Sequence, residues 1–148
     1  MREQEVIQEL KRIAADNGGI LTAENVVLAA SDPQSPLHPK FTWDDTKAAH
    51  AYRLWQARQL ISVTVEYIGR DDEQAEPTRV FVSLTTDRKS EGGRYRQTAA
   101  VMRQKSLRAQ LLADAMQEME RFQVKYARLK ELAEVFEAMR RVRKAEAA

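Results

Sequence analysis

Few side chains in this sequence are of the types that carry out catalysis or bind metal ions. Asp44 and Asp45 are adjacent carboxylates, and His38 and His50 are the only two histidines. Three protein ligands at a spacing that suits a metal ion cannot be assembled from these residues. Adjacent aspartates before an apolar run are typical of a helix start, where they cap the first turn and favour the helix dipole. We therefore expect no enzyme activity and no cofactor.

Other ligand-binding motifs are also missing. Neither of the two glycine pairs, Gly18-Gly19 and Gly92-Gly93, belongs to a phosphate-binding pattern, and they predict a helix stop and a linker. The acidic residues between 71 and 76 lack the alternating order of a calcium loop, so they predict a solvated turn. With no cysteine, the chain has no disulfide framework and no thiolate ligands.

Composition indicates a soluble protein with an uneven charge. The 148 residues suffice for one domain with a core and an extension, and they contain no apolar run long enough to span a bilayer. Because the amino terminus also lacks the pattern of a secretion signal, we expect a cytoplasmic protein without membrane contact. Residues 1–93 carry 11 Lys and Arg against 15 Asp and Glu, whereas residues 94–148 carry 13 against 7. The cations therefore gather in the carboxyl-terminal part.

Three helices are expected in the first 61 residues. Apolar side chains at helical spacing predict the first helix over residues 3–16, and Thr22 caps a second helix that follows directly. Residues 32–40 contain three of the four prolines, so they form a loop, which Leu37 attaches to the core. The third helix then runs to Ile61.

The stretch Phe41–Ile61 is the expected centre of the fold. Asp44 or Asp45 is predicted to be its N-cap, with Trp43 as an apolar staple. Two opposite sides of the helix are apolar and are therefore both expected to be buried: Ala48, Ala51, Tyr52 and Trp55 on one, and Leu54, Ala57 and Ile61 on the other. Arg53 and Gln56 lie on the strip between these sides, which is the predicted surface for ligand recognition.

After Ile61 the apolar period becomes that of a strand. Residues 62–69 and 78–85 alternate in polarity and predict a two-stranded hairpin, with a polar connector between them. Residues 88–93 predict a linker, because they combine charges with two glycines. The expected domains are thus 1–87 and 94–148, joined by 88–93.

The last segment, residues 94–148, contains neither glycine nor proline and is expected to be helical. Apolar residues at spacings of three and four form a coiled-coil-like seam for self-association: Met119, Phe122, Tyr126, Leu129, Ala133 and Phe136. The alternative is two helices that fold back on the chain's own domain. The pattern does not decide between one helix and a helical hairpin.

The expected order of three helices and a hairpin resembles the winged helix-turn-helix plan, in which the third helix enters a DNA groove and the hairpin is the wing. The fold class is therefore mainly α with a small β-hairpin: a winged-helix-like domain followed by long carboxyl-terminal helices. The sequence departs from a standard helix-turn-helix, because about a dozen residues separate its second and third helices instead of the usual three or four.

Two phrases, SPLHPKFTWDD at Ser35–Asp45 and QARQLI at Gln56–Ile61, also resemble small proteins encoded by phages and prophages. This resemblance implies an accessory or regulatory protein of a mobile element. It transfers no functional residue to the chain.

Together these patterns favour a dimeric or larger phage-type regulator that binds DNA. Cations and one amide are the candidate DNA contacts: Lys47, Arg53, Gln56, Arg58, Arg70, Arg79, Arg94, Arg96, Arg103 and Lys105. The alternative function is a helical adaptor or inhibitor that binds a host or phage protein without binding DNA.

Overall fold

The computed structural model describes residues 2–43, 46–68 and 76–147. The chain divides into two compact units, Met1–Lys105 and Ser106–Ala148. Both are mainly helical, and the first also contains small antiparallel sheets. This confirms the expected mixture of helices with a little β-structure.

The first two helices form as the sequence predicted. Helix α1 spans Arg2–Asp16 and buries Val6, Leu10, Ile13 and Ala14. It stops at Gly18 and Gly19, which have φ angles of 67° and 84° in the region that favours glycine. Strand β1, Ile20–Leu21, follows. Helix α2, Ala23–Ala30, is capped by Thr22, whose hydroxyl accepts a hydrogen bond from the Asn25 amide at 3.1 Å.

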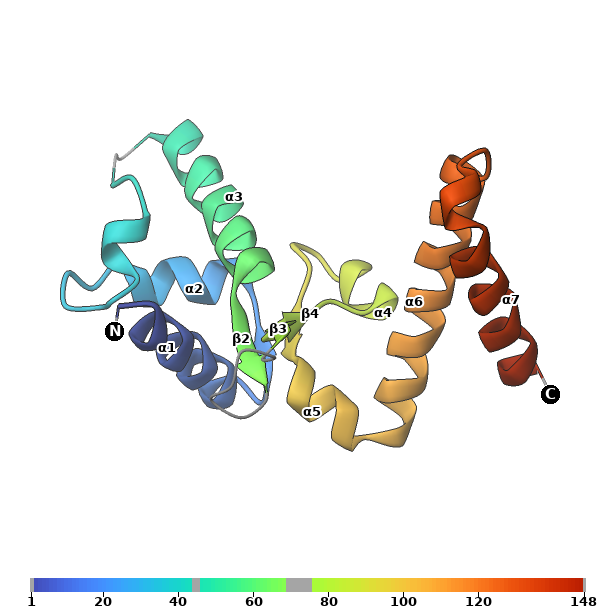
Figure 1. Ribbon diagram of the computed structural model, residues 1–148. Coiled ribbons are helices and arrows are strands. Elements are labelled where there is room, and N and C mark those ends of the chain that lie inside the picture. The colour runs from blue at the N-terminus through green and yellow to red at the C-terminus, as the bar shows by residue number, and fades with distance from the viewer. Residues whose placement is uncertain (1, 44–45, 69–75, 148) are drawn as a thin grey trace. The chain divides into compact units, whose positions relative to one another are not determined.

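The loop after α2 leads to the third helix, and its apolar residues attach it to the core. It contains a short 3₁₀ helix at His38–Lys40, and Leu37 is fully buried in the core, as expected. Helix α3 spans Lys47–Val63 and packs against α2 (Figure 1). The core of the unit combines residues of α1 and α2 with Ala57 and Ile61 of α3. One side of α3 therefore holds it on the domain.

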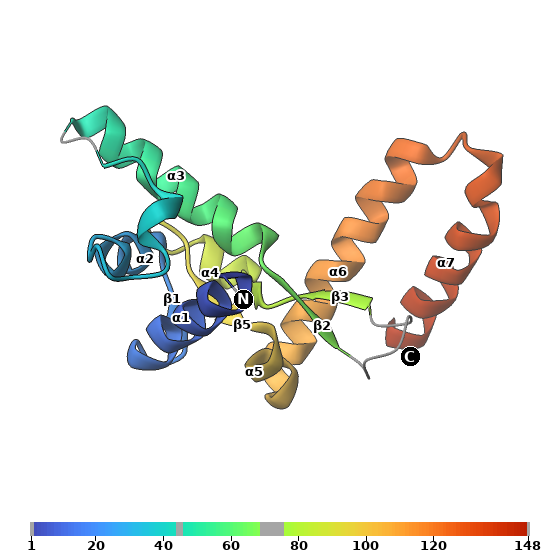
Figure 2. The same cartoon turned by 60° about the vertical axis from the view of Figure 1, so that its left-hand side comes forward.

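The predicted hairpin is confirmed, with shorter strands. Strand β2, Val65–Ile68, pairs antiparallel with β3, Glu76–Arg79, and Val65 lies opposite Arg79. Figure 2 shows β2 continuing from the end of α3, with β3 beside it. After a bend at Val80 the chain enters β4, Phe81–Val82, whose partner is a later strand.

The first unit continues past the predicted linker at 88–93. Helix α4, Thr85–Arg88, is followed by β5, Tyr95–Gln97, which pairs with β1 on one side and with β4 on the other. Because β5 is the central strand of this sheet, its residues belong to the first unit. Helix α5, Thr98–Arg103, completes it. The structure thus divides the chain at Lys105 and Ser106 instead of at 88–93, since pairing of strands distant in sequence decides the boundary.

The second unit is a helical hairpin. Helix α6 spans Lys105–Tyr126 and α7 spans Ala133–Ala147, and a short 3₁₀ turn at Lys130–Leu132 lies between them. The two helices run antiparallel to each other (Figure 2). The sequence left one helix or a hairpin open, and the structure has the hairpin. None of the described helices is both long enough and apolar enough to cross a membrane.

Candidate nucleic-acid interface

Helix α3 begins at a different cap from the predicted one. The N-cap is Thr46, whose hydroxyl accepts a hydrogen bond from the Ala49 amide at 3.1 Å. Asp44 and Asp45, the predicted caps, lie outside the described residues. A threonine hydroxyl serves the first turn in the same way as a carboxylate does, without adding negative charge to the start of the helix.

The expectation that α3 is buried on two sides is wrong. Ala57 and Ile61 are buried, but the opposite side, with Ala48, Ala51, Tyr52 and Trp55, is exposed. Tyr52 and Trp55 keep 50% and 52% of their surface accessible. The two rings stack on each other instead, with centroids 5.7 Å apart and an interplanar angle of 14°. The helix therefore presents an aromatic face away from its own core.

Arg53 and Gln56, the predicted base readers, hold the preceding loop on α3. The Arg53 guanidinium donates to the Thr42 carbonyl at 3.0 Å and lies over the Trp43 ring, 5.3 Å from its centroid. The Gln56 side-chain oxygen accepts a hydrogen bond from the Thr42 amide at 3.3 Å. Trp43 also stacks on His38 and donates to its carbonyl at 3.0 Å. These contacts fix the loop, so the predicted recognition strip has a structural role.

Arg94 and Arg96, two predicted phosphate contacts, are paired with a buried carboxylate. Asp87 is 0% exposed, and the Arg96 Nε atom donates to its two oxygens at 2.9 and 3.1 Å. A nitrogen of Arg94 lies 3.7 Å from the same carboxylate. The Leu84 amide also donates to Asp87, at 3.2 Å. Because burying an unpaired carboxylate is costly, these arginines stabilise the fold.

The remaining predicted DNA contacts lie in several places. Lys47, at the first turn of α3, is exposed, and Arg58, also on α3, is half-buried and donates to the Gly92 carbonyl at 3.4 Å. The other three are exposed and lie on β3, at the end of α5 and at the start of α6: Arg79, Arg103 and Lys105. Arg70 lies outside the described residues. Of the predicted set, α3 itself therefore contributes Lys47 and Arg58, which lie along one edge of the helix.

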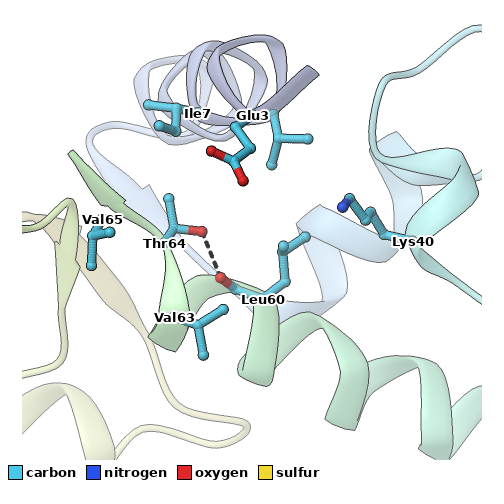
Figure 3. Close-up of a pocket in the computed structure, with 8 residues that line it drawn as sticks. Glu3, Ile7, Lys40, Leu60, Val63, Thr64 and Val65 are labelled. Carbon is cyan, nitrogen blue, oxygen red and sulfur yellow. Dashed lines mark hydrogen bonds between the residues drawn. The ribbon is translucent and has the colours of Figure 1, made fainter. Parts of the chain in front are cut away.

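A shallow hollow opens between α1 and the carboxyl-terminal end of α3. Its volume is about 200 Å³, and Glu3, Ile7 and Leu60 are among its lining residues (Figure 3). The Thr64 hydroxyl, which also lines the hollow, donates a hydrogen bond to the Leu60 carbonyl at 2.6 Å. Pockets that enclose small-molecule ligands are larger, about 300–1,000 Å³. We assign no ligand to this hollow.

The predicted seam of the last segment is divided between the two helices of the hairpin. Phe122 on α6 meets Phe136 on α7 with ring centroids 6.1 Å apart, and Phe136 is buried there. Leu129 lies in the connection, and Ala133 is the first residue of α7. The seam residues thus do not share one helix, although their contribution to self-association stays a prediction.

Two residues of this region, Asp87 and Gln59, were not singled out from the sequence. Asp87 reads as part of a polar break, and the only local sign of its role is its position at the third residue of a short helix, where a carboxylate reaches back to the preceding amide. Gln59 is exposed on α3 and lies four residues after Trp55. Helical spacing alone would have placed it on the same face of the helix as Trp55.

The described residues contain no cluster of three or more potential metal ligands. The chain matches no protein-family model, and no curated protein and no solved structure is significantly similar to it.

Proposed function

We propose that this protein binds DNA through the exposed face of α3, as an accessory or regulatory protein of the phage type. The observation that carries the proposal is the composition of that face. It presents two exposed aromatic rings, Tyr52 and Trp55, on a helix that contains Lys47, Arg53 and Arg58 and no Asp or Glu. A helix with cations and no carboxylates attracts phosphate, and the aromatic rings supply contact area for bases.

The position of α3 in the chain also supports this proposal. The third helix is followed directly by the β2–β3 hairpin, as in the winged-helix plan, where these two elements approach the duplex. The proposed contacts differ from those expected from the sequence, because Arg53 and Gln56 hold the loop and Arg94 and Arg96 pair with Asp87. We therefore place recognition on Tyr52, Trp55 and Gln59, with Lys47 beside them.

The direct test is a mobility shift with random duplex and single-stranded DNA at two salt concentrations. Binding should weaken steeply between about 50 and 200 mM salt, because phosphate contacts release counterions. Lys47→Ala should weaken binding to every sequence, whereas Arg2→Ala removes the same charge from α1 and should leave it unchanged. Absence of binding at low salt would contradict the proposal.

A second candidate is an adaptor that holds a protein partner on the same face. The exposed Tyr52–Trp55 pair favours it, because tyrosine and tryptophan dominate the binding energy of many protein interfaces. Such an adaptor would show no DNA binding at low salt. A cross-linking experiment from a photoreactive group at residue 59 would then identify the partner.

We also propose that the hairpin of α6 and α7 makes the protein a dimer or larger oligomer. Among the described residues of this unit, only Phe136 and Met139 are buried, and α6 buries none over its 22 residues. Two helices with so small a core are stabilised by further helices, as in a four-helix bundle. Self-association would bring two α3 faces into one particle.

A further inference from the structure

We infer that the Tyr52–Trp55 pair binds unpaired bases, so that the ligand class of α3 is single-stranded DNA. This inference rests on the proposed function and narrows it. Its starting point is the geometry of the pair: the stacked rings, 5.7 Å apart, each cover part of the other and each leave about half of their surface in water. Two large aromatic side chains left exposed together favour a ligand that covers them.

The core of the first unit contains aromatic side chains, but Tyr52 and Trp55 are not among them. Phe81 is fully buried, and Phe41 is buried at the base of the loop that precedes α3. Tyr52 and Trp55 instead lie on the side of α3 opposite to Ala57 and Ile61, which pack in the core. Because this side does not contribute to the core, its aromatic composition is better explained by binding than by folding.

The charges around the pair suit a phosphate backbone. Lys47 and Arg58 are eleven residues apart, which is about three turns, so they lie along one edge of the helix roughly 16 Å from each other. No carboxylate occurs between Lys47 and Val63. Trp55 lies next to this edge, three residues before Arg58, so a strand along the edge would meet a cation at each end and the Trp55 ring between them.

The contacts made by Arg53 and Gln56 favour single strands over a duplex. Reading a duplex requires hydrogen-bonding side chains that reach base edges in the groove. The two long polar side chains predicted for this purpose, Arg53 and Gln56, bind the backbone of Thr42 instead. Stacking needs only the flat face of a base, which a single strand offers and a duplex hides.

The α3 face that carries Tyr52 and Trp55 is also held in place before any ligand binds. Arg53 connects α3 to the loop through the Thr42 carbonyl and the Trp43 ring, one residue away from Tyr52 in the chain. Since the helix does not have to be ordered on binding, less conformational entropy is lost.

The test uses tryptophan fluorescence of the full chain, because stacked bases quench it. The sequence contains two tryptophans, so Trp43→Phe leaves Trp55 as the single reporter. The probes are a thymine oligonucleotide of about 20 residues and a random duplex of the same length, at about 50 mM salt. We expect the single strand to quench Trp55 and to bind at least about tenfold more tightly than the duplex.

Variants then separate stacking from charge. Trp55→Ala, followed by anisotropy of a labelled oligonucleotide, should weaken single-strand binding roughly 5- to 150-fold, as expected for loss of one stacked base. Leu28→Ala, an exposed apolar residue on α2, is the matched control and should change nothing. Circular dichroism of each variant confirms that it is folded.

The fluorescence and anisotropy measurements together test the single-strand inference separately from the proposed DNA binding. Equal or tighter binding to the duplex overturns the single-strand inference but leaves DNA binding in place. Absence of binding to both probes overturns both and moves the α3 face to a protein partner. Tight single-strand binding that Trp55→Ala leaves unchanged overturns stacking on this pair.

Discussion

Replacing Asp87 should strongly destabilise the first unit. The carboxylate is fully buried and accepts hydrogen bonds from Arg96, on the central strand β5, and from the Leu84 amide at the start of α4. Asp87→Ala would leave a partly buried guanidinium without its counter-charge and the amide without its acceptor. Breaking a buried ion pair by removing one partner costs about 3–5 kcal/mol.

The expected loss for Asp87→Ala lies near the lower end of that range, about 3 kcal/mol, because 23% of the Arg96 side chain remains in contact with water. Asp87→Asn should cost less, since an amide oxygen can still accept from Leu84 while the charge is lost. Urea denaturation followed by circular dichroism measures both free energies of unfolding.

The matched control for Asp87 is Glu91→Ala, which removes an exposed carboxylate four residues away. Its effect should stay within about 0.5 kcal/mol. If Asp87→Ala changes the free energy of unfolding as little as Glu91→Ala does, the ion pair between Asp87 and Arg96 does not stabilise the first unit. A double-mutant cycle with Arg96→Gln then measures the coupling between the two side chains directly.

Three further predictions concern stability and assembly. Trp55→Ala should lower the free energy of unfolding by less than about 1.5 kcal/mol, because the ring is half exposed; a loss of 3 kcal/mol or more would show that it belongs to the core. Light scattering should give the full chain a mass of at least two copies, and a mass of one copy would refute self-association through α6 and α7. Hydrogen bonds from Arg12 hold the pKa of the Glu9 carboxyl below its ordinary value. These hydrogen bonds therefore stabilise the fold at any pH above the ordinary pKa of Glu9, and the stabilisation is lost as the pH falls through the lowered pKa. Thermal melts of the parent and of Arg12→Ala should therefore differ at neutral pH and converge in acid.

Local sequence patterns were sufficient for the elements that depend on local interactions. The apolar spacing of α1, the Gly18-Gly19 stop and the Thr22 cap all form as predicted, because each involves residues within one turn of another. The β2–β3 hairpin was also predicted, since its strands are neighbours in the chain.

The features that failed depend on partners distant in sequence. The sequence predicts a helix where strand β5 forms, because the pairing of β5 with β1, some 75 residues earlier, leaves no local signal. The pairing of Arg94 and Arg96 with Asp87 was also not predicted, because it depends on how the fold brings these three side chains together. A sequence shows which side chains are charged, but not which of them are already paired.

The aromatic face of α3 was misread for a different reason. Helical periodicity identified Tyr52 and Trp55 correctly as one apolar stripe. The same pattern is produced by a face that packs in a core and by a face that binds a ligand. Only the packing of α3 through Ala57 and Ile61 shows which side is covered.

The most direct test of the central claim, that α3 is a DNA-binding face, is a titration of the full chain against a labelled single-stranded oligonucleotide by fluorescence anisotropy. It should be made at about 50 and about 200 mM salt. We predict saturable binding that weakens with salt and that is lowered both by Lys47→Ala and by Trp55→Ala, but not by Arg2→Ala. Binding that is absent at low salt, or that none of these variants changes, would contradict the assignment of α3.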